Sequence, residues 1–120
     1  MLRTGVDVIE VDRIRRAAER HGERFYARFY TPAERERSGG RYPALASRFA
    51  AKEAVAKALG TGIGDMRWTD IEVIHDERGR PEIALHGAAA RIASELGLKE
   101  WSVSLSHTHE HAIAFVVATG

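Results

Sequence analysis

The sequence predicts an α+β fold in which an antiparallel sheet packs with one long helix and several short ones. Apolar and polar residues alternate near both ends of the chain, as they do in half-buried strands. An alanine-rich segment with helical character occupies the middle, and the turn at residues 76–79 joins two short apolar runs in the manner of a hairpin. The resulting order is strand, helices, hairpin, helix, hairpin, which disfavours a doubly wound parallel sheet.

The first third of the chain is predicted to form one strand followed by three short helices. Residues 4–11 alternate as a strand, and Asp12 is placed to cap a helix over residues 13–20. A second short helix covers residues 23–30. Thr31-Pro32-Ala33-Glu34 has the form of a capping box with proline at the first helical position, so a third helix begins there.

The rest of the chain is predicted to form the long helix, a shorter helix and two hairpins. The long helix covers residues 43–59, with proline at its start and Gly60 at its end. At about 100° per residue its core stripe consists of Leu45, Phe49, Ala56 and Leu59. The remaining elements are strands 71–74 and 82–85, helix 88–96 closed by Gly97, and strands 101–107 and 112–118.

Length and composition indicate one small domain, residues 1–120. A domain of this size buries a limited share of its surface, so a deep cleft is expected to need a neighbouring subunit. The chain has no cysteine, which excludes disulfides, thiolate metal sites and a cysteine nucleophile. No apolar run approaches the roughly 18 residues of a membrane span, and the first residues lack the features of a signal peptide. We therefore expect a cytoplasmic protein without a membrane partner.

Charge is unevenly distributed although the net charge is only +1. Residues 1–48 contain eleven arginines and seven acidic residues, so the remainder carries a net negative charge. A basic front half indicates an anionic partner that meets one face of the protein.

Asp7 is the first candidate for a functional residue. On strand alternation it shares an apolar face with Gly5, Ile9 and Val11, where an ionised carboxylate needs a cation, a set of donors or a metal. Bonding to backbone amides or pairing with an arginine would also explain it.

The long helix carries two further candidates, Glu53 and Lys57, which flank its apolar stripe beside Phe49. An ordinary surface pair at i, i+4 is one interpretation. The other is a carboxylate and an ammonium that hold a metal-bound diphosphate. Arg48 and Lys52 have the same spacing and repel each other, so an outside anion would be favoured near them.

Glycines and a histidine give weaker signals. Gly60-Thr61-Gly62-Ile63-Gly64 follows a helix and lacks the Lys-Ser/Thr ending, so it is not a P-loop. Gly60 alone would be a helix cap, but three glycines in five residues permit close backbone approach and amides that cradle phosphate.

His107 shares the face of Trp101 and Leu105, where a histidine is more often a core residue than a ligand. A zinc site in the run from His107 to His111 is not expected, because its i, i+2 spacing falls on a turn.

Arg13, Arg16 and Arg20 line one face of the first helix, with Arg24 and Arg28 beyond the break that follows it. A solvated face is the default interpretation, and a docking ridge for an acidic protein or a nucleic acid is the alternative. Single-stranded RNA binding usually adds exposed aromatic residues. Trp101, Phe49 and Phe115 are expected on core faces, so a nucleic-acid partner is not expected.

Three motifs taken together are more specific than any one of them. GVDVIEVDRI near the start, RFAAKEAVAKALGTGIG in the middle and VSLSHTHEHAIAFVVA at the end resemble the holo-acyl-carrier-protein synthases. These are the small phosphopantetheinyl transferases, and the resemblance spans nearly the whole chain, including Gly79-Arg80-Pro81. It implies the phosphopantetheinyl transferase fold in homotrimers with clefts between subunits. The implied reaction moves phosphopantetheine from coenzyme A to a serine of an acyl carrier protein, for fatty acid biosynthesis.

The resemblance also implies roles for individual residues. Asp7 and Glu53 match magnesium ligands, and Lys57 matches a lysine that contacts phosphate and assists proton transfer. Arg48 and His107 match positions that contact the nucleotide end of coenzyme A. The remaining correspondences are Gly60 and Gly62 in the loop near the pantetheine and phosphates, Arg13 against an acidic helix of the carrier protein, and Arg16 and Arg20 as helpers.

Two questions stay open at the level of sequence. The general base that takes the serine proton is Glu53, Asp7 or a metal-bound water. A non-catalytic coenzyme A or nucleotide-binding subunit is the rival function, and it would not need both carboxylates.

Overall fold

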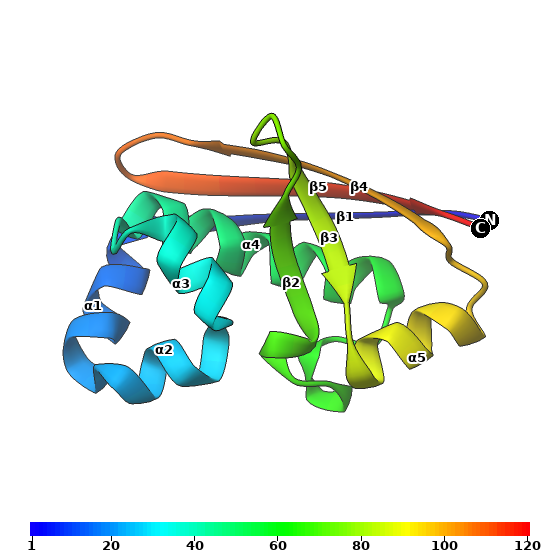
Figure 1. The fold of residues 1–120 in the computed structure, drawn as a ribbon, viewed down its shortest axis with the longest axis horizontal. Coiled ribbons are helices and arrows are strands. Elements are labelled where there is room, and N and C mark those ends of the chain that lie inside the picture. The colour runs from blue at the N-terminus through cyan, green and yellow to red at the C-terminus, as the bar shows by residue number, and fades with distance from the viewer.

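The structure, a computed structural model, describes all 120 residues as an α+β fold with two antiparallel sheets (Figure 1). One sheet has three strands in the order β1-β5-β4, and the other is the hairpin β2-β3. The strands are β1 (Leu2–Glu10), β2 (Ile71–His75), β3 (Pro81–Leu85), β4 (Glu100–His107) and β5 (His111–Thr119). The helices are α1 (Val11–His21), α2 (Glu23–Phe29), α3 (Pro32–Ser38), α4 (Tyr42–Leu59) and α5 (Gly87–Glu95), with 3-10 turns η1 (Ile63–Asp65) and η2 (Trp68–Asp70). The predicted α+β class is confirmed.

The helix caps were predicted with mixed success. At α3 the capping box is confirmed, because the Glu34 amide donates to Thr31 Oγ1 at 3.2 Å and the Thr31 amide donates to Glu34 Oε1 at 2.9 Å. The prediction that Asp12 caps α1 is wrong. The helix begins at Val11 directly after β1, and the Asp12 carboxylate accepts from Arg15 Nε at 2.7 Å instead.

Helix α4 packs on the inner face of the three-stranded sheet through small side chains. Ala50, Ala54 and Ala58 on the helix are fully or almost fully buried, and so are alternate residues of β5 such as Ala112 and Ala114. Of the predicted core stripe, Leu45, Ala56 and Leu59 are buried and Phe49 is partly buried against the core, but burial extends beyond the stripe to twelve of the eighteen residues of α4. The helix lies between the sheet on one side and α1, α3 and β2 on the others (Figure 1), so nearly every face of it is covered.

The outer face of the same sheet is apolar and exposed. Val6 pairs with Phe115, and Val8 pairs with Ile113. These four side chains are between 41% and 57% exposed. The prediction that Phe115 lies on a core face is wrong, because the alternation of β5 places its alanines inward and Phe115 outward.

Both ends of the chain lie at one end of the three-stranded sheet, since Leu2 of β1 pairs with Thr119 of β5 (Figure 1). None of the helices combines the length and the apolar character that a membrane crossing needs. The cytoplasmic location and the single domain over residues 1–120 stay predictions.

Candidate functional site

The approach of β1 to α4 creates the candidate site, and Gly5 permits this approach. A Cβ built at Gly5 would overlap the carbonyl oxygen of Ala54 on α4. The strand can lie this close only because glycine has no side chain. Asp7 follows two positions later on the same face of β1, and Glu53 precedes Ala54, so the two carboxylates come from neighbouring stretches of backbone.

Asp7 is bonded to the lysine predicted to accompany it. Lys57 Nζ lies 3.2 Å from Asp7 Oδ1 and donates to the carbonyl oxygen of Val6 at 2.9 Å. The Asp7 side chain is 18% exposed, whereas that of Lys57 is 54% exposed. The ammonium therefore reaches solvent at the edge of the site while the carboxylate is set back from it.

Glu53 is partly buried and makes no hydrogen bond or ion pair within the chain. Burial raises its pKa, and the neighbouring Asp7 carboxylate raises it further. Lys57 and Arg13 act in the opposite direction but do not cancel the effect. Two carboxylates that repel each other, one of them without a partner, form a site that favours an added cation.

The chemistry of these donors fits a hard divalent cation. Magnesium is bound through one or two carboxylates and completes its octahedron with water and substrate phosphates. The protein contains no group of three or more His, Cys, Asp or Glu side chains placed to hold a metal. A cation at Asp7 and Glu53 would therefore have two protein ligands, and the remaining positions would be open to substrate.

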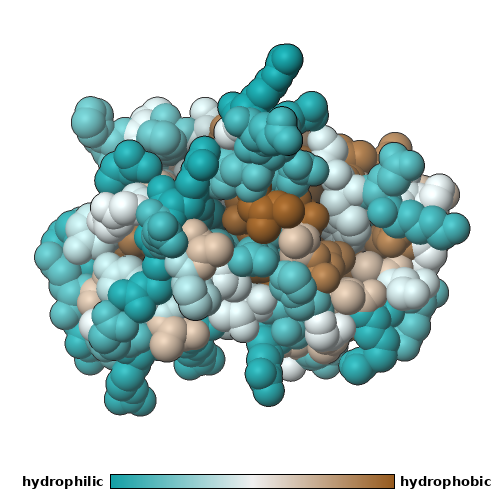
Figure 2. Space-filling model, in the orientation of Figure 1, coloured by the Kyte–Doolittle hydropathy of each residue, from teal (hydrophilic) through white to brown (hydrophobic).

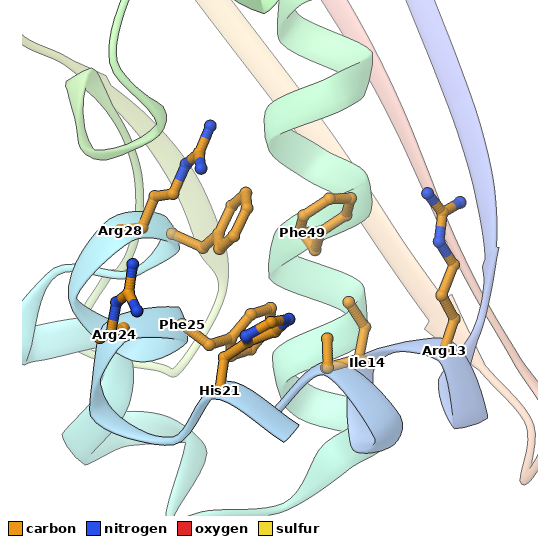
Figure 3. A pocket seen from close by; sticks show the side chains of 9 residues that line it. Arg13, Ile14, His21, Arg24, Phe25, Arg28 and Phe49 are labelled. Carbon is orange, nitrogen blue, oxygen red and sulfur yellow. The ribbon is translucent and has the colours of Figure 1, made fainter. Parts of the chain in front are cut away.

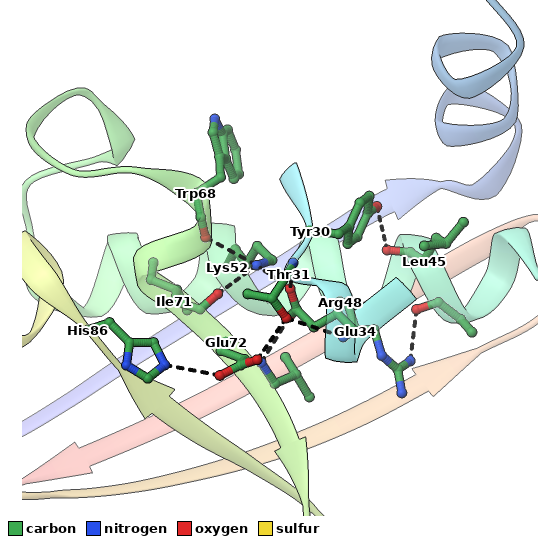
Figure 4. A network of polar contacts seen from close by, with 12 residues as sticks. Tyr30, Thr31, Glu34, Leu45, Arg48, Lys52, Trp68, Ile71, Glu72 and His86 are labelled. Atoms are coloured by element: carbon green, nitrogen blue, oxygen red, sulfur yellow. Dashed lines mark hydrogen bonds and ion pairs between the residues drawn. The ribbon is translucent and has the colours of Figure 1, made fainter. Parts of the chain in front are cut away.

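Lys52 lies on a different face of α4 and has a different environment. Its side chain and that of Glu34 are both 0% exposed, with Nζ 2.8 Å from Glu34 Oε1. The ammonium also donates to the carbonyl oxygens of Ile71 at 2.6 Å and Trp68 at 3.1 Å (Figure 4). The prediction that Lys52 and Arg48 favour an outside anion is therefore wrong for Lys52, whose three donors are all satisfied internally.

The same carboxylate connects several elements. Glu34 Oε2 accepts from the Val73 amide at 2.9 Å, while the capping box joins Glu34 to Thr31. Thr31 Oγ1 donates to Glu72 at 2.7 Å, and Glu72 lies 3.0 Å from His86 Nε2 (Figure 4). The sequence did not reveal this network, because the partners are far apart in the chain. It fixes α3, α4 and β2 to one another.

Arg48 is buried among other cations. It is 6% exposed, and burial lowers its pKa, with Arg37 and Arg41 lowering it further. Its Nη1 donates to the Ala44 carbonyl at 2.9 Å, and its Nη2 lies 3.2 Å from His75 Nε2. Its Nε is buried without any partner. Arg48 and Glu53 are five positions apart, which places them about 140° apart around the helix axis.

The glycine segment and His107 lie at opposite ends of the sheet–helix unit. Gly60 ends α4 in the left-handed conformation at φ 78°, and Gly62 also has a positive φ of 71°. Arg3 Nη1 donates to the Ala58 carbonyl at 3.3 Å beside Gly60. His107 is exposed at the last position of β4, opposite Ala112. The predicted binding residues are thus distributed around α4 rather than gathered in one cleft of a single chain.

A pocket of about 410 Å³ opens between α1, α2 and α4. Figure 3 shows Arg13 on one side of it, Arg24 and Arg28 on the other, and Phe49 between them. The pocket is lined by basic residues (Arg13, His21, Arg24, Arg28) and apolar residues (Ile14, Ala17, Phe25, Phe29, Phe49). Because Phe49 lines the pocket and lies one turn before Glu53 on α4, the pocket borders the carboxylate site.

Of the arginines predicted to form the ridge, Arg13, Arg24 and Arg28 line this pocket, whereas Arg16 and Arg20 do not. Arg16 pairs with Asp12 at 3.2 Å, and Glu19 pairs with Arg15. Arg20 is exposed in the last turn of α1. Arg24-Phe25 and Arg28-Phe29 repeat at i, i+4, which places both arginines on one side of α2, where they form the other basic wall of the pocket.

The chain matches a family model described as the 4'-phosphopantetheinyl transferase superfamily over residues 3–116. A holo-[acyl-carrier-protein] synthase of Herpetosiphon aurantiacus is 51% identical, and the match covers 100% of both chains. The enzyme of the same name from Halorhodospira halophila is 52% identical over 94% of this chain and 93% of its own.

Solved structures have the same fold. The holo-[acyl-carrier-protein] synthase of Neisseria meningitidis superimposes with a TM-score of 0.89 at 38% identity and 98% coverage of each chain. That of Helicobacter pylori, crystallised in complex with coenzyme A, gives 0.88 at 31% identity, with 97% of this chain and 99% of the other covered. Matched along nearly its entire length in motifs, sequence and fold, the chain belongs to the holo-[acyl-carrier-protein] synthase family within the 4'-phosphopantetheinyl transferase superfamily.

Proposed function

We propose that this chain is a transferase that moves 4'-phosphopantetheine from coenzyme A to a serine of an apo-acyl carrier protein. The products are holo-acyl carrier protein and adenosine 3',5'-bisphosphate. One observation carries the proposal: a partly buried carboxylate on β1 and an unpaired one on α4 lie together with Lys57, next to a basic pocket. Membership of the family supports the same reaction.

The reaction is a displacement at phosphorus. The serine oxygen of the carrier protein forms a bond to the phosphorus that bears pantetheine. The bond from that phosphorus to the bridging oxygen of the diphosphate breaks, and adenosine 3',5'-bisphosphate leaves with the bridging oxygen. The nucleophile belongs to the partner, so the chain itself needs to supply only binding, charge stabilisation and a base for the serine proton.

Asp7 and Glu53 would hold Mg²⁺, the cation whose preferences their oxygens fit. Such an ion, when bound, offsets charge on the diphosphate. Burial and the neighbouring Asp7 carboxylate both raise the pKa of Glu53, and a cation would relieve the repulsion between the two carboxylates. The unpaired Glu53 also has room for a further ligand, because nothing in the chain occupies its oxygens.

Lys57 would stabilise the charge that develops on the leaving phosphate. Its ammonium is held in place by the Val6 carbonyl and Asp7, and more than half of the side chain remains accessible. A positioned donor aimed at developing charge is worth about 10²–10³ in rate in comparable sites.

Arg48, His107, Gly60 and Gly62 would bind the rest of coenzyme A. In one chain Arg48 and Glu53 project from different faces of α4. We therefore propose that the cleft forms between subunits of a homotrimer, with the acidic pair from one subunit and nucleotide contacts from its neighbour. Homotrimers with clefts between subunits are what the family resemblance implies.

The exposed apolar face of the three-stranded sheet supports such an assembly. Val6, Val8, Ile113 and Phe115 form a continuous patch across β1 and β5. Large apolar patches of this kind usually mark protein interfaces. Figure 2 shows a further apolar patch over the β2–β3 hairpin, which carries the exposed Ile74. Sedimentation of the purified protein measures the number of subunits, and a monomer at micromolar concentration would contradict the trimer.

The acyl carrier protein would dock at the pocket between α1, α2 and α4. Its arginines would pair with acidic side chains, and Phe25, Phe29 and Phe49 would accept apolar ones, a combination that fits an amphipathic acidic helix. Arg13 lies between this pocket and the carboxylate site. A carrier protein bound in the pocket would therefore have its serine near the diphosphate. Arg16 and Arg20 would contribute long-range attraction from outside the pocket.

The direct test combines purified protein, coenzyme A, Mg²⁺ and an apo-acyl carrier protein. The intact mass of the carrier should rise by one phosphopantetheine unit, and a chelator should prevent the change. Binding of coenzyme A without any gain in mass would instead favour the non-catalytic nucleotide-binding subunit.

The Glu53→Gln variant tests the carboxylate site. It should abolish transfer while leaving the fold and coenzyme A binding nearly intact, because the amide cannot replace the charged ligand. Glu95→Gln is the matched control, since Glu95 is exposed on α5 without an ion pair. A fully active Glu53→Gln enzyme would show that the metal assignment is wrong.

A further inference from the structure

We propose that His75 is a positioning residue for Arg48. Its neutral imidazole accepts a hydrogen bond from the guanidinium and orients it toward the phosphate at the nucleotide end of coenzyme A. The inference rests on the proposed function, and the sequence motifs give no role to His75.

Two contacts hold the Arg48 guanidinium in place. Nη1 donates to the Ala44 carbonyl one turn earlier on α4, and Nη2 lies 3.2 Å from His75 Nε2 at the end of β2. The side chain is 94% buried, and its Nε has no partner. A long side chain clamped at both ends of its guanidinium cannot turn freely, so its remaining N–H groups point in fixed directions.

The hydrogen-bonding roles in this contact follow from chemistry. Arginine only donates, so Nε2 of His75 must accept and the ring must carry its proton on Nδ1. Burial lowers the pKa of His75, and the charges of Arg48 and Arg37 lower it further, while Asp76 opposes them. The environment therefore maintains the neutral form that the contact requires.

The surroundings of Arg48 lack a partner anion. Arg37 and Arg41 lie close enough to affect its pKa, and none of the three takes part in an ion pair within the chain. The carboxylate that acts on the pKa of Arg48 is that of Glu34, which is already bonded to Lys52. A buried arginine among unpaired arginines favours an added anion, and a phosphate fits the donor geometry of the guanidinium.

The chemistry of coenzyme A indicates which phosphate this is. The diphosphate belongs at Asp7, Glu53 and Lys57 in the proposed reaction. The other anionic group of the molecule is the phosphate on the 3' oxygen of the ribose. Because that group is absent from 3'-dephospho-coenzyme A, the two compounds separate an effect on Arg48 from a general effect on the fold.

The test compares His75→Ala and His75→Gln with the wild type. The alanine variant should raise the KM for coenzyme A about tenfold, with the kcat and the KM for the carrier protein unchanged. The glutamine variant should restore most of the wild-type KM, because its amide oxygen can accept from Arg48. With 3'-dephospho-coenzyme A as substrate, the wild type and His75→Ala should have the same KM.

His86→Ala provides the matched control, since this histidine also makes one side-chain contact to β2, with Glu72. It should leave the KM for coenzyme A unchanged. A wild-type KM in His75→Ala, or an equal penalty with and without the 3' phosphate, would overturn the proposal. Calorimetric titration with coenzyme A repeats the comparison without catalysis, so a failure of transfer activity does not affect this test.

Discussion

Two lysines of α4, Lys52 and Lys57, lie five positions apart in opposite environments. Lys52 is fully buried, and its three donors reach Glu34 and two backbone carbonyls. Lys57 is more than half exposed and lies next to Asp7, while Glu53 beside it has no partner. All hydrogen-bond donors of Lys52 therefore have partners within the chain. The charged groups around Lys57 and Glu53 can still bind a ligand or an ion.

The difference indicates how similar residue types divide between structure and chemistry on one helix. Charged groups that satisfy one another internally stabilise an arrangement but have no capacity left for a ligand. Groups that remain unsatisfied at an accessible edge cost stability and retain that capacity. The comparison predicts that substitution of Lys52 mainly lowers the free energy of unfolding, whereas substitution of Lys57 mainly lowers the transfer activity.

Lys52→Met should cause the largest change, a loss of about 3–5 kcal/mol in the free energy of unfolding, because Glu34 would remain buried without its counter-charge. Urea denaturation measures this loss. The double variant Lys52→Met with Glu34→Gln should recover part of it, since the uncompensated charge is gone. A loss below about 1 kcal/mol in the single variant would mean that the pair does not hold the fold together.

Lys57→Met should instead reduce kcat/KM for transfer by about 10²–10³, equivalent to roughly 3–4 kcal/mol in the activation free energy. Its free energy of unfolding should change by less than about 1 kcal/mol, because an exposed ion pair contributes little. Steady-state kinetics and urea denaturation on the same preparation separate the two effects. Lys99→Met, at an exposed position, is the control, and equal losses of stability and activity in Lys57→Met would contradict the comparison.

Gly5→Ala should cost about 1–3 kcal/mol in stability, because the added methyl group must displace β1 from α4. Transfer activity should fall by more than the unfolded fraction explains, since the same displacement separates Asp7 from Glu53. Thermal unfolding and kinetics at a temperature where the variant is folded measure both effects. Gly64→Ala, where an added Cβ meets nothing within 4 Å, is the stability control.

The sequence predicted the parts of this protein that depend on local pattern. Strand alternation placed Asp7 on the inner face of β1, and helical periodicity placed Glu53 and Lys57 on one side of α4. The contact between Asp7 and Lys57 then required only that the strand pack on the helix. The capping box at Thr31 was equally local. The catalytic and binding roles of these residues stay predictions.

Features that depend on distant partners were not predicted. Lys52 is paired with Glu34, eighteen positions earlier, and Arg48 contacts His75, twenty-seven positions later. Phe115 was placed inside because an aromatic residue on a strand usually faces a core. Alternation gives two possible faces, and only the alanines packed against α4 decide which one is buried.

The pairing of Leu2 with Thr119 has a practical consequence for experiments on this protein. Chain ends that lie side by side can be joined by a short linker, which is the geometry that circular permutation requires. A fluorescent label or an affinity tag at either terminus would sit at the far end of the sheet from α1 and α2 (Figure 1). Binding of a carrier protein could then be followed by such a label without obstructing the surface where docking is proposed.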